Sequence, residues 1–392
     1  MDKMTPRERF WKTVNFEEPD RVPIQLGGLA SSLTPVRDGF GKYGYDAVCR
    51  YLGIEDYEDP EGDFGTYNLH PKIKERGHND FELVVMGSPE RIKMPDYDKN
   101  NEERHKMWGF HSLMHNGVTA FPDELSPLRN ATTIKEIEEY EFWPDPDDPV
   151  YYEGVRDQAK KLHENTQYVI IGDSGYAATI DFTYHWLRGF TNWMQDPYVN
   201  PDLYIALKNK ITDISIEISK RFFSEVGPYI DMTAYYADLG SQQAGFFSND
   251  YFKKWILPFL KRWNEAIKPL TKAKRWIHSC GSIYHYIPYY IEAGFEIVNP
   301  LQPLAKNMEP WRLKKDFYKK VVLHGGIDLQ RLLSMGTVDE VVEGVKEVIT
   351  HLAPGGGWIA APANNIPQDC PPENIFAALD TVYKYGKYPI SL

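Results

Sequence analysis

The chain has 392 residues, of which 42% are hydrophobic, and its 44 basic and 56 acidic residues give a net charge of −12 at pH 7. This composition is typical of a globular protein with a sizeable core, and no basic stripe is interleaved with aromatic residues, which argues against nucleic-acid binding. Residues 1–20 hold no apolar core of a signal peptide and no apolar run reaches the ~18 residues that span a bilayer, so we expect a cytoplasmic protein that does not enter a membrane.

The first predicted element is a helix that begins at Pro6, because Thr5 and Glu8 have the spacing of a capping box. The helix is expected to end near Pro19 and to lead into a short strand over residues 21–26.

Residues 34–149 form the least regular part of the sequence. They are polar and rich in Pro, Asp and Gly, with short extended pieces such as 81–85. We interpret them as a long insertion or cap within a single domain that spans residues 1–392.

From residue 150 onward, β-rich runs alternate with longer helical patterns. Further strands are predicted at 168–172, 232–237, 275–278, 296–299, 321–324 and 358–361. Helices are predicted at 151–163, 201–226, 248–267, 282–293, 309–317, 337–352 and 372–383. This alternation is typical of βαβ units and a parallel sheet. Seven strands are predicted in all, an eighth is not identified, and no Gly-rich dinucleotide fingerprint follows the first strand, so a (β/α)₈ TIM-type barrel is favoured over a doubly wound α/β sheet.

Every predicted strand ends in a polar side chain, which is where parallel α/β folds place their chemistry. The candidates are Gln25, Asp173, Asp238, His278, Cys280, Asn299, Asp328 and Asn364. Their convergence indicates an enzyme. The simpler alternative is that such residues only satisfy loop backbone and cap helices.

His278 and Cys280 are two residues apart, so on an extended strand their side chains point to the same side. An imidazole and a thiolate form half of a zinc site, and a catalytic zinc needs a third protein ligand. Cys370 follows the last strand and is the first candidate, with Asp238 or a glutamate as alternatives. Either cysteine could instead be an ordinary core thiol.

Three aspartates are candidate acid/base or orienting groups, namely Asp173, Asp238 and Asp328. Asp328 has a competing role as the cap of a helix that begins at Leu329. Tyr236 lies on a strand beside these residues and is expected to contact a substrate.

Several motifs taken together resemble the uroporphyrinogen decarboxylase superfamily. They are Met4–Phe10 with Glu18–Pro23, Ala237–Gln243, His278–Ser282, Gly325–Asp328, Ala353–Gly357 and Pro371–Ile375, and they span almost the whole chain in the expected order. The resemblance implies a barrel.

The superfamily has two functional branches. Its decarboxylases carry an early arginine-rich segment that grips porphyrinogen carboxylates, whereas this chain has no arginine in residues 24–32. The absence of this segment disfavours decarboxylation of a tetrapyrrole or another carboxylated ring, which remains the first alternative. A non-catalytic corrinoid- or tetrapyrrole-binding barrel is the second alternative.

The other branch comprises cobalamin-dependent methyltransferases, in which a His-x-Cys motif and a distant cysteine bind zinc. His278 and Cys280 match that motif. By alignment back from Pro371, the distant cysteine falls where Asn364 stands here. Either Cys370 is a shifted ligand, or another carboxylate completes the site, or no zinc binds.

The resemblance implies a methyltransferase that moves a methyl group to the cobalamin of a partner corrinoid protein. A methoxylated aromatic donor suits the aromatic-rich mouth, with zinc acting as a Lewis acid on the ether oxygen. Gln25, Tyr236, Asn299 and Asn364 are expected to position this small methylated substrate. Members of the superfamily often form homodimers, although no pattern in this sequence points to one.

Overall fold

The computed structural model describes residues 3–29, 43–57, 69–87, 102–104, 107–115 and 118–392. Seven strands form a parallel sheet in the order β1-β5-β6-β7-β8-β9-β10, and a separate three-stranded sheet has the order β2-β3-β4. The seven strands are β1 Phe81–Val85, β5 Val169–Asp173, β6 Met232–Thr233, β7 Lys274–His278, β8 Ile297–Leu301, β9 Val322–Ile327 and β10 Trp358–Pro362. Every pair of neighbours in this sheet is parallel.

The predicted strand over residues 21–26 closes the ring between β10 and β1. Ile24 forms a parallel bridge with Ala360 on one side, and the Asp80 amide donates to the Ile24 carbonyl at 2.8 Å on the other. The fold is therefore the expected TIM-type barrel.

The strand that the sequence analysis did not identify is β1. It lies inside the region interpreted as an irregular insertion, so that interpretation is wrong for residues 71–85, which form helix α3 (Pro71–Arg76) and β1 of the barrel itself. The antiparallel sheet of β2 (Glu102–Arg104), β3 (His111–His115) and β4 (Val118–Ala120) stands apart from the barrel sheet.

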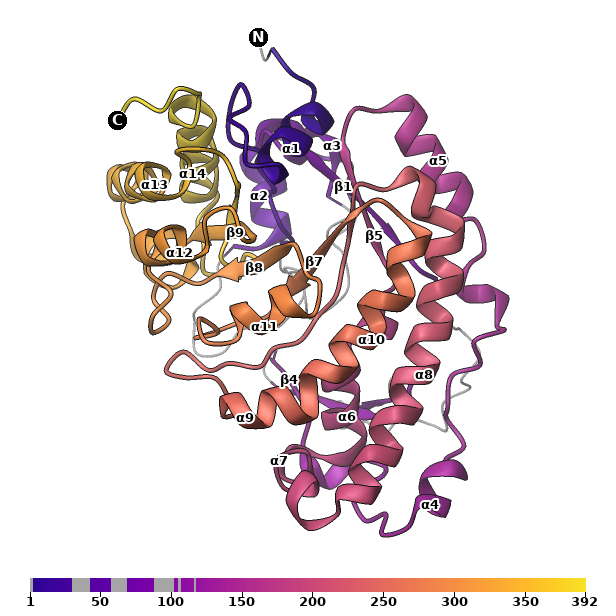
Figure 1. Cartoon of the computed structure of the whole chain (residues 1–392). Helices are drawn as coiled ribbons and strands as arrows, with labels where there is room; N and C mark the ends of the chain where they lie inside the picture. Colours follow the sequence, from indigo (N-terminus) through magenta and orange to yellow (C-terminus); the bar gives the residue numbers. More distant parts are fainter. Residues whose placement is uncertain (1–2, 30–42, 58–68, 88–101, 105–106, 116–117) are drawn as a thin grey trace.

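Helices surround the barrel (Figure 1). In chain order the α-helices are α1 Pro6–Val14, α2 Tyr45–Tyr51, α3, α4 Ile134–Glu138, α5 Val155–Asn165, α6 Ile180–Arg188, α7 Phe190–Val199, α8 Pro201–Val226, α9 Asn249–Tyr251, α10 Leu257–Ile267, α11 Ile287–Glu292, α12 Pro310–Phe317, α13 Val338–Leu352 and α14 Pro372–Tyr385. Short helical turns fill several loops, among them η8 Leu329–Leu333 after β9. No helix of the described residues is long and apolar enough to cross a membrane.

The local signals read from the sequence explain these elements. Helix α1 begins at Pro6 with the expected capping box between Thr5 and Glu8, but it ends at Val14 and not near Pro19 as predicted. Strands β5, β8, β9 and β10 are buried along their whole length, as parallel strands covered on both faces should be.

The barrel interior has a core of its own, separate from the larger core between the strands and the outer helices. Phe10 and Val14 of α1 pack there with apolar side chains of the strands, which are Phe81, Val169, Ile171, Met232, Ala234, Trp276, Ile297, Val322 and Ile359. Since the Arg7 amide also donates to the Gln167 carbonyl just ahead of β5, α1 plugs the amino-terminal end of the barrel. The opposite end is left for the polar residues that follow the strands.

Candidate metal centre and pocket

Three side chains at the carboxyl ends of β6 and β7 bring potential metal ligands together. Asp238, His278 and Cys280 each offer an atom, and these atoms all lie within 4.8 Å of one another. The His278 Nε2 atom is 3.3 Å from the Cys280 Sγ and 3.6 Å from the Asp238 Oδ1. Neighbouring parallel strands end at one edge of the sheet, which explains why Asp238 and His278 meet although 40 residues separate them.

The ring of His278 is held in one orientation by Asn299 of β8. The His278 Nδ1 lies 2.7 Å from the Asn299 Oδ1, and the Asn299 Nδ2 donates to the His324 carbonyl at 3.4 Å. Because the amide oxygen can only accept, Nδ1 carries the proton and Nε2 turns its lone pair toward Asp238 and Cys280. This is how histidine ligands of metals are commonly oriented.

The turn after β7 depends on a glycine. Gly281 has φ of 86°, and a Cβ atom there would lie 2.4 Å from the Gly240 carbonyl oxygen. The Gly281 amide donates to the Gln302 side chain at 3.0 Å. The close approach brings the chain segment of Cys280 against that of Asp238, whose Oδ1 accepts the Cys280 amide at 2.8 Å.

The Cys280 thiol lies beside a carboxylate and an amide. Burial raises the pKa of Cys280 well above its usual value, and Asp238 raises it further, while the Asn364 side chain lowers it. The Asn364 Nδ2 donates to the Cys280 Sγ at 3.2 Å. A half-buried thiol next to a carboxylate is an unfavourable arrangement for two anions, and a divalent cation between them would remove that penalty.

The donor set fits zinc. In tetrahedral coordination, nitrogen, oxygen and sulfur ligands of zinc lie about 3.3 to 3.6 Å apart, given metal–ligand distances of about 2.0 to 2.3 Å. The two distances from the His278 Nε2 match that spacing. Three protein ligands would leave the fourth position open, as catalytic zinc sites do.

Cys370, the expected third ligand, does not belong to this group. Its side chain is 1% exposed and packs in the outer core, and its Sγ faces the Asp369 carboxylate at 3.8 Å. Burial raises the pKa of this thiol. The carboxylate of Asp238, which was an alternative third ligand in the sequence analysis, lies beside His278 and Cys280 instead.

Asp328 is also not where an acid/base group would act. Its carboxylate caps η8 by accepting the amides of Gln330, Arg331 and Leu332 at 2.9 to 3.0 Å. With both oxygens engaged by backbone, the capping role is the one that the structure supports.

Asp173 acts on the site through Tyr236. The Tyr236 hydroxyl donates to the Asp173 Oδ2 at 2.6 Å, and the Gly175 amide donates to the Oδ1 at 2.7 Å. Burial raises the pKa of the Asp173 carboxyl, and the hydrogen bonds from Tyr236 and Gly175 oppose this shift. Tyr236 lines the adjoining pocket and Asp173 does not, so the Asp173 carboxylate reaches the pocket through its hydrogen bond with the Tyr236 hydroxyl.

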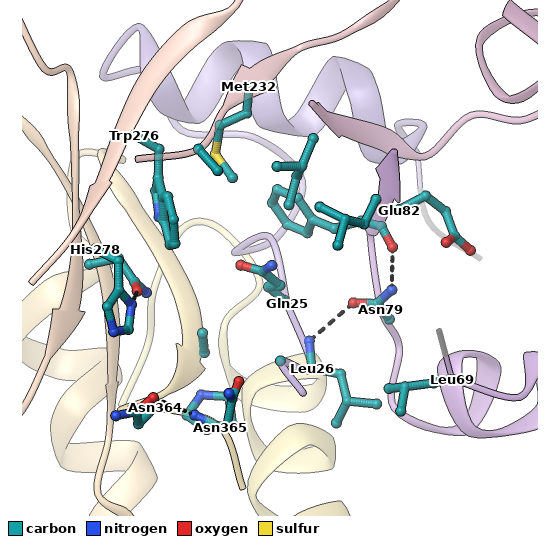
Figure 2. A pocket seen from close by; sticks show the side chains of 18 of the residues that line it. Gln25, Leu26, Leu69, Asn79, Glu82, Met232, Trp276, His278, Asn364 and Asn365 are labelled. Atoms are coloured by element: carbon teal, nitrogen blue, oxygen red, sulfur yellow. Dashed lines mark hydrogen bonds between the residues drawn. The ribbon is translucent and has the colours of Figure 1, made fainter. Parts of the chain in front are cut away.

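A pocket extends from the His278 side of this centre toward the wall between residues 25–27 and β1 (Figure 2). Its apolar and aromatic lining comprises Leu26, Leu69, Phe81, Leu83, Ile171, Met232, Ala234, Tyr236, Trp276, Ala361 and Pro362, and its polar lining comprises Gln25, Lys74, Asn79, Glu82, His278, Asn299, Asn364 and Asn365. The four residues expected to position a substrate, Gln25, Tyr236, Asn299 and Asn364, all line it. Figure 2 shows Gln25 between the His278 side and the Glu82 side.

The residues at the far side of this pocket were not predicted from the sequence. Lys74, Asn79 and Glu82 come from α3, from the turn after it and from β1, all within the region interpreted as an insertion. The predicted barrel lacked an eighth strand, and the apolar run Phe81–Val85 could have been assigned to that place. This assignment would have placed these residues in the barrel wall.

The protein-family model described as uroporphyrinogen decarboxylase (URO-D) matches residues 113–385. No curated protein matches the chain. Among solved structures, a methyltransferase from Methanosarcina mazei is similar over 98% of this chain and 99% of its own, with a TM-score of 0.62 and 16% identity. Xylanase 10B from Thermotoga maritima is similar over 61% of this chain and 82% of its own, with a TM-score of only 0.38 and 11% identity. At 16% identity, the likeness to the methyltransferase shows the barrel fold alone.

Proposed function

Because the chain belongs to the uroporphyrinogen decarboxylase family, we propose that it is a methyltransferase of that family, and that it moves a methyl group from a methoxylated aromatic to the cobalt of a corrinoid protein. The observation that carries the proposal is the group of Asp238, His278 and Cys280 beside a pocket with aromatic walls. The whole-length likeness to a methyltransferase fold agrees with it.

Decarboxylation of a porphyrinogen is the alternative within the family, and the pocket argues against it. A substrate with many carboxylates needs several cations, and arginine is the residue best suited to bind them. No arginine lines this pocket among the described residues, and its one lysine, Lys74, is paired with Glu82. A non-catalytic barrel would not need an imidazole nitrogen at zinc-ligand spacing from both a carboxylate and a thiol.

Asp238, His278 and Cys280 would hold zinc, which when bound would supply a Lewis acid to the ether oxygen, so that this oxygen leaves as a phenolate when the Co(I) of the corrinoid protein takes the methyl group. The protein's own residues orient the reactants. Asn299 keeps the His278 Nε2 facing the site, and Asn364 stabilises negative charge on the Cys280 sulfur.

The pocket would hold the donor in place during transfer. Tyr236, fixed by Asp173, and Trp276 form aromatic walls whose rings meet edge to face, with centroids 5.6 Å apart. Gln25 can donate to or accept from a substituent of the aromatic ring. Holding the methyl group in line with the acceptor and excluding water is the main contribution expected from such a barrel.

The decisive experiment combines metal analysis with methyl transfer. The purified chain is supplied with a corrinoid protein reduced to Co(I) and with methoxyarenes, methanol or methylamines, and formation of methyl-Co(III) is followed by absorbance. We expect zinc near one equivalent and methyl-cobalt from a methoxyarene. If no donor in the screen produces methyl-cobalt, the proposal is wrong.

Cys280→Ala and Cys370→Ala form a matched pair of variants for the same experiment. The first should lose zinc and transfer together, while the second should keep both, because Cys370 is not part of the ligand group and its Sγ contacts the Asp369 carboxylate. Equal zinc loss in both variants would contradict the assignment of the ligands.

A further inference from the structure

A histidine inside the barrel lies beside several residues of the pocket wall without lining the pocket itself. His324 of β9 is fully buried, and its ring lies nearly parallel to that of Phe81, with the centroids 6.3 Å apart and the planes at 18°. Its Nδ1 accepts the Trp276 indole N–H at 2.8 Å, and its carbonyl accepts the Asn299 Nδ2 at 3.4 Å. Phe81, Trp276 and Asn299 all line the pocket, and they come from three different strands.

The hydrogen bond with Trp276 fixes the state of the imidazole. An indole N–H can only donate, so the His324 Nδ1 is unprotonated and the neutral ring carries its proton on Nε2. No described residue accepts a hydrogen bond from that Nε2, and a buried donor without a partner is destabilising. Two apolar side chains of the same shape would bury no polar group and can be as stable as such a pair. The pair is therefore better explained by the orientation of the Trp276 ring than by stability.

Trp276 forms the part of the pocket wall that lies next to the candidate metal centre. The centroid of its ring is 5.8 Å from that of His278, and the ring meets that of Tyr236 edge to face, with centroids 5.6 Å apart and planes at 84°. Figure 2 shows Trp276 and His278 on the same side of the cavity. Without an acceptor on His324, the indole N–H would be buried and unpaired, and the ring would have to turn toward other polar groups to satisfy it. The aromatic wall beside His278 would then change its shape.

We propose that His324 is a positioning residue, whose Nδ1 holds the Trp276 ring against the aromatic ring of the ligand. The inference rests on the proposed function where it identifies that ligand as the methyl donor. His324 acts through Trp276, since it belongs neither to the ligand group nor to the pocket lining. A well-placed aromatic partner strengthens the binding of an aromatic ring by about two- to twelvefold, which is the effect that losing the acceptor should reduce.

The test compares anisole with cyclohexyl methyl ether, which has the same methoxy group on a saturated ring of similar size. Both are titrated calorimetrically into the natural protein and its variants. Any difference in how the two ether oxygens meet a bound metal ion is the same in every protein, so a change in the ratio of the two affinities measures the aromatic wall. His324→Leu should lower the preference for anisole by at least about threefold. His324→Asn, whose amide oxygen takes the place of the Nδ1 acceptor, should retain most of it.

The control is Ser219→Ala, which removes the acceptor of another buried indole, that of Trp263, outside the pocket. It should leave the ratio unchanged, and thermal melts verify that each variant is folded. The natural ratio in a folded His324→Leu protein would overturn the inference. An equal fall of the ratio in His324→Asn or in Ser219→Ala, or no binding of either ligand to the natural protein at about 5 mM, would do the same.

A second measurement does not require His324→Leu to fold. In protein labelled with ¹⁵N-tryptophan, Trp276→Phe identifies the Trp276 indole resonance by its loss from the spectrum. The indole proton of Trp276 should lie downfield of that of the exposed Trp311 and exchange more slowly with water, because it is buried and bonded to a ring nitrogen. A Trp276 proton with the shift and exchange rate of the Trp311 proton would overturn the inference.

Neither measurement needs a methyl acceptor, so both separate this inference from the proposed function. If they give the expected results and no methyl-cobalt forms, only the proposed function fails. If methyl transfer occurs and His324→Leu keeps the natural ratio of affinities, only the positioning role of His324 fails.

Discussion

At the scale of single residues, the candidate metal centre depends on side chains that touch its ligands and are not ligands themselves. The Asn299 Oδ1 accepts a hydrogen bond from the His278 Nδ1–H, and the Asn364 Nδ2 donates a hydrogen bond to the Cys280 sulfur. Both were expected from the sequence to contact substrate, and both line the pocket. Their hydrogen bonds give them the additional role of orienting the group that would bind zinc.

Replacing Asn299 by leucine should weaken zinc binding about 10- to 100-fold, because the imidazole loses the acceptor that fixes its tautomer and orientation. Competition against a chromophoric chelator measures the affinity. Gln25→Leu is the matched control, an amide of the same pocket with no contact to the three ligands, and its zinc affinity should be unchanged. An Asn299→Leu protein that retains full affinity would show that the hydrogen bond does not orient His278.

The buried histidine His324 makes stability depend on pH. Its ring accepts the Trp276 indole N–H at 2.8 Å, and burial, with a smaller effect of His278, lowers its pKa to about 3. The unfolded chain protonates this residue below its ordinary pKa of about 6.5, whereas the folded chain keeps it neutral to about pH 3. Stability from this residue is therefore present above pH 6.5 and is lost as the pH falls from there toward 3.

Urea unfolding at pH 7 and pH 5 tests this dependence. The contribution of His324 amounts to about 2 kcal/mol lost between these two values. His324→Gln, which keeps an acceptor for the Trp276 indole, should show a smaller loss than the natural protein by that amount. His351→Gln, on an outer helix, should lose as much stability between pH 7 and pH 5 as the natural protein. Equal losses of stability in all three proteins would contradict the assignment of this pH dependence to His324.

At the scale of elements, the loops after the barrel strands are fixed by capping and close backbone contact. Asp328 shows this most clearly, since its carboxylate accepts three amides of the helical turn η8. An aspartate at the end of a barrel strand can therefore stabilise the following loop by capping a helical turn, without taking part in catalysis.

Asp328→Ala should lower the free energy of unfolding by about 0.5 to 2 kcal/mol, the usual effect of losing an N-terminal cap. Zinc content and methyl transfer should change little, because the carboxylate is not part of the ligand group. Asp328→Asn retains one side-chain oxygen that can accept a hydrogen bond. Its free energy of unfolding should therefore lie between those of the natural protein and Asp328→Ala. Abolished transfer in an Asp328→Ala protein of near-natural stability would restore this residue as an acid/base candidate.

At the scale of the whole molecule, the barrel is closed by a buried ionic network. The Asp80 carboxylate binds Arg9 of α1 at 2.7 Å, Arg21 at 2.8 Å and the Ile24 amide at 2.8 Å. These contacts join the helix that plugs the barrel, the strand over residues 21–26 and β1.

Asp80→Ala should destabilise the protein by about 3 to 5 kcal/mol, because it leaves buried guanidinium groups without the carboxylate that they share. Asp380→Ala is the control, since Asp380 pairs with Arg76 with side chains 45% and 37% exposed, and it should lower stability by no more than about 1 kcal/mol. Chemical unfolding of both variants gives the comparison. Similar losses of unfolding free energy in Asp80→Ala and Asp380→Ala would mean that Asp80 does not close the barrel.

The sequence by itself determined the barrel class, most strands, the start of α1 and the pairing of His278 with Cys280. These depend on local signals, namely capping, apolar runs and the alternation of side chains along a strand. The tertiary structure decided the rest. Whether Cys370 or Asp238 completes the ligand group depends on which way each side chain points, and packing in the outer core turns the Cys370 thiol away. Strand β1 was hidden in an irregular stretch because its place in the barrel comes from its pairing with β5, 88 residues along the chain.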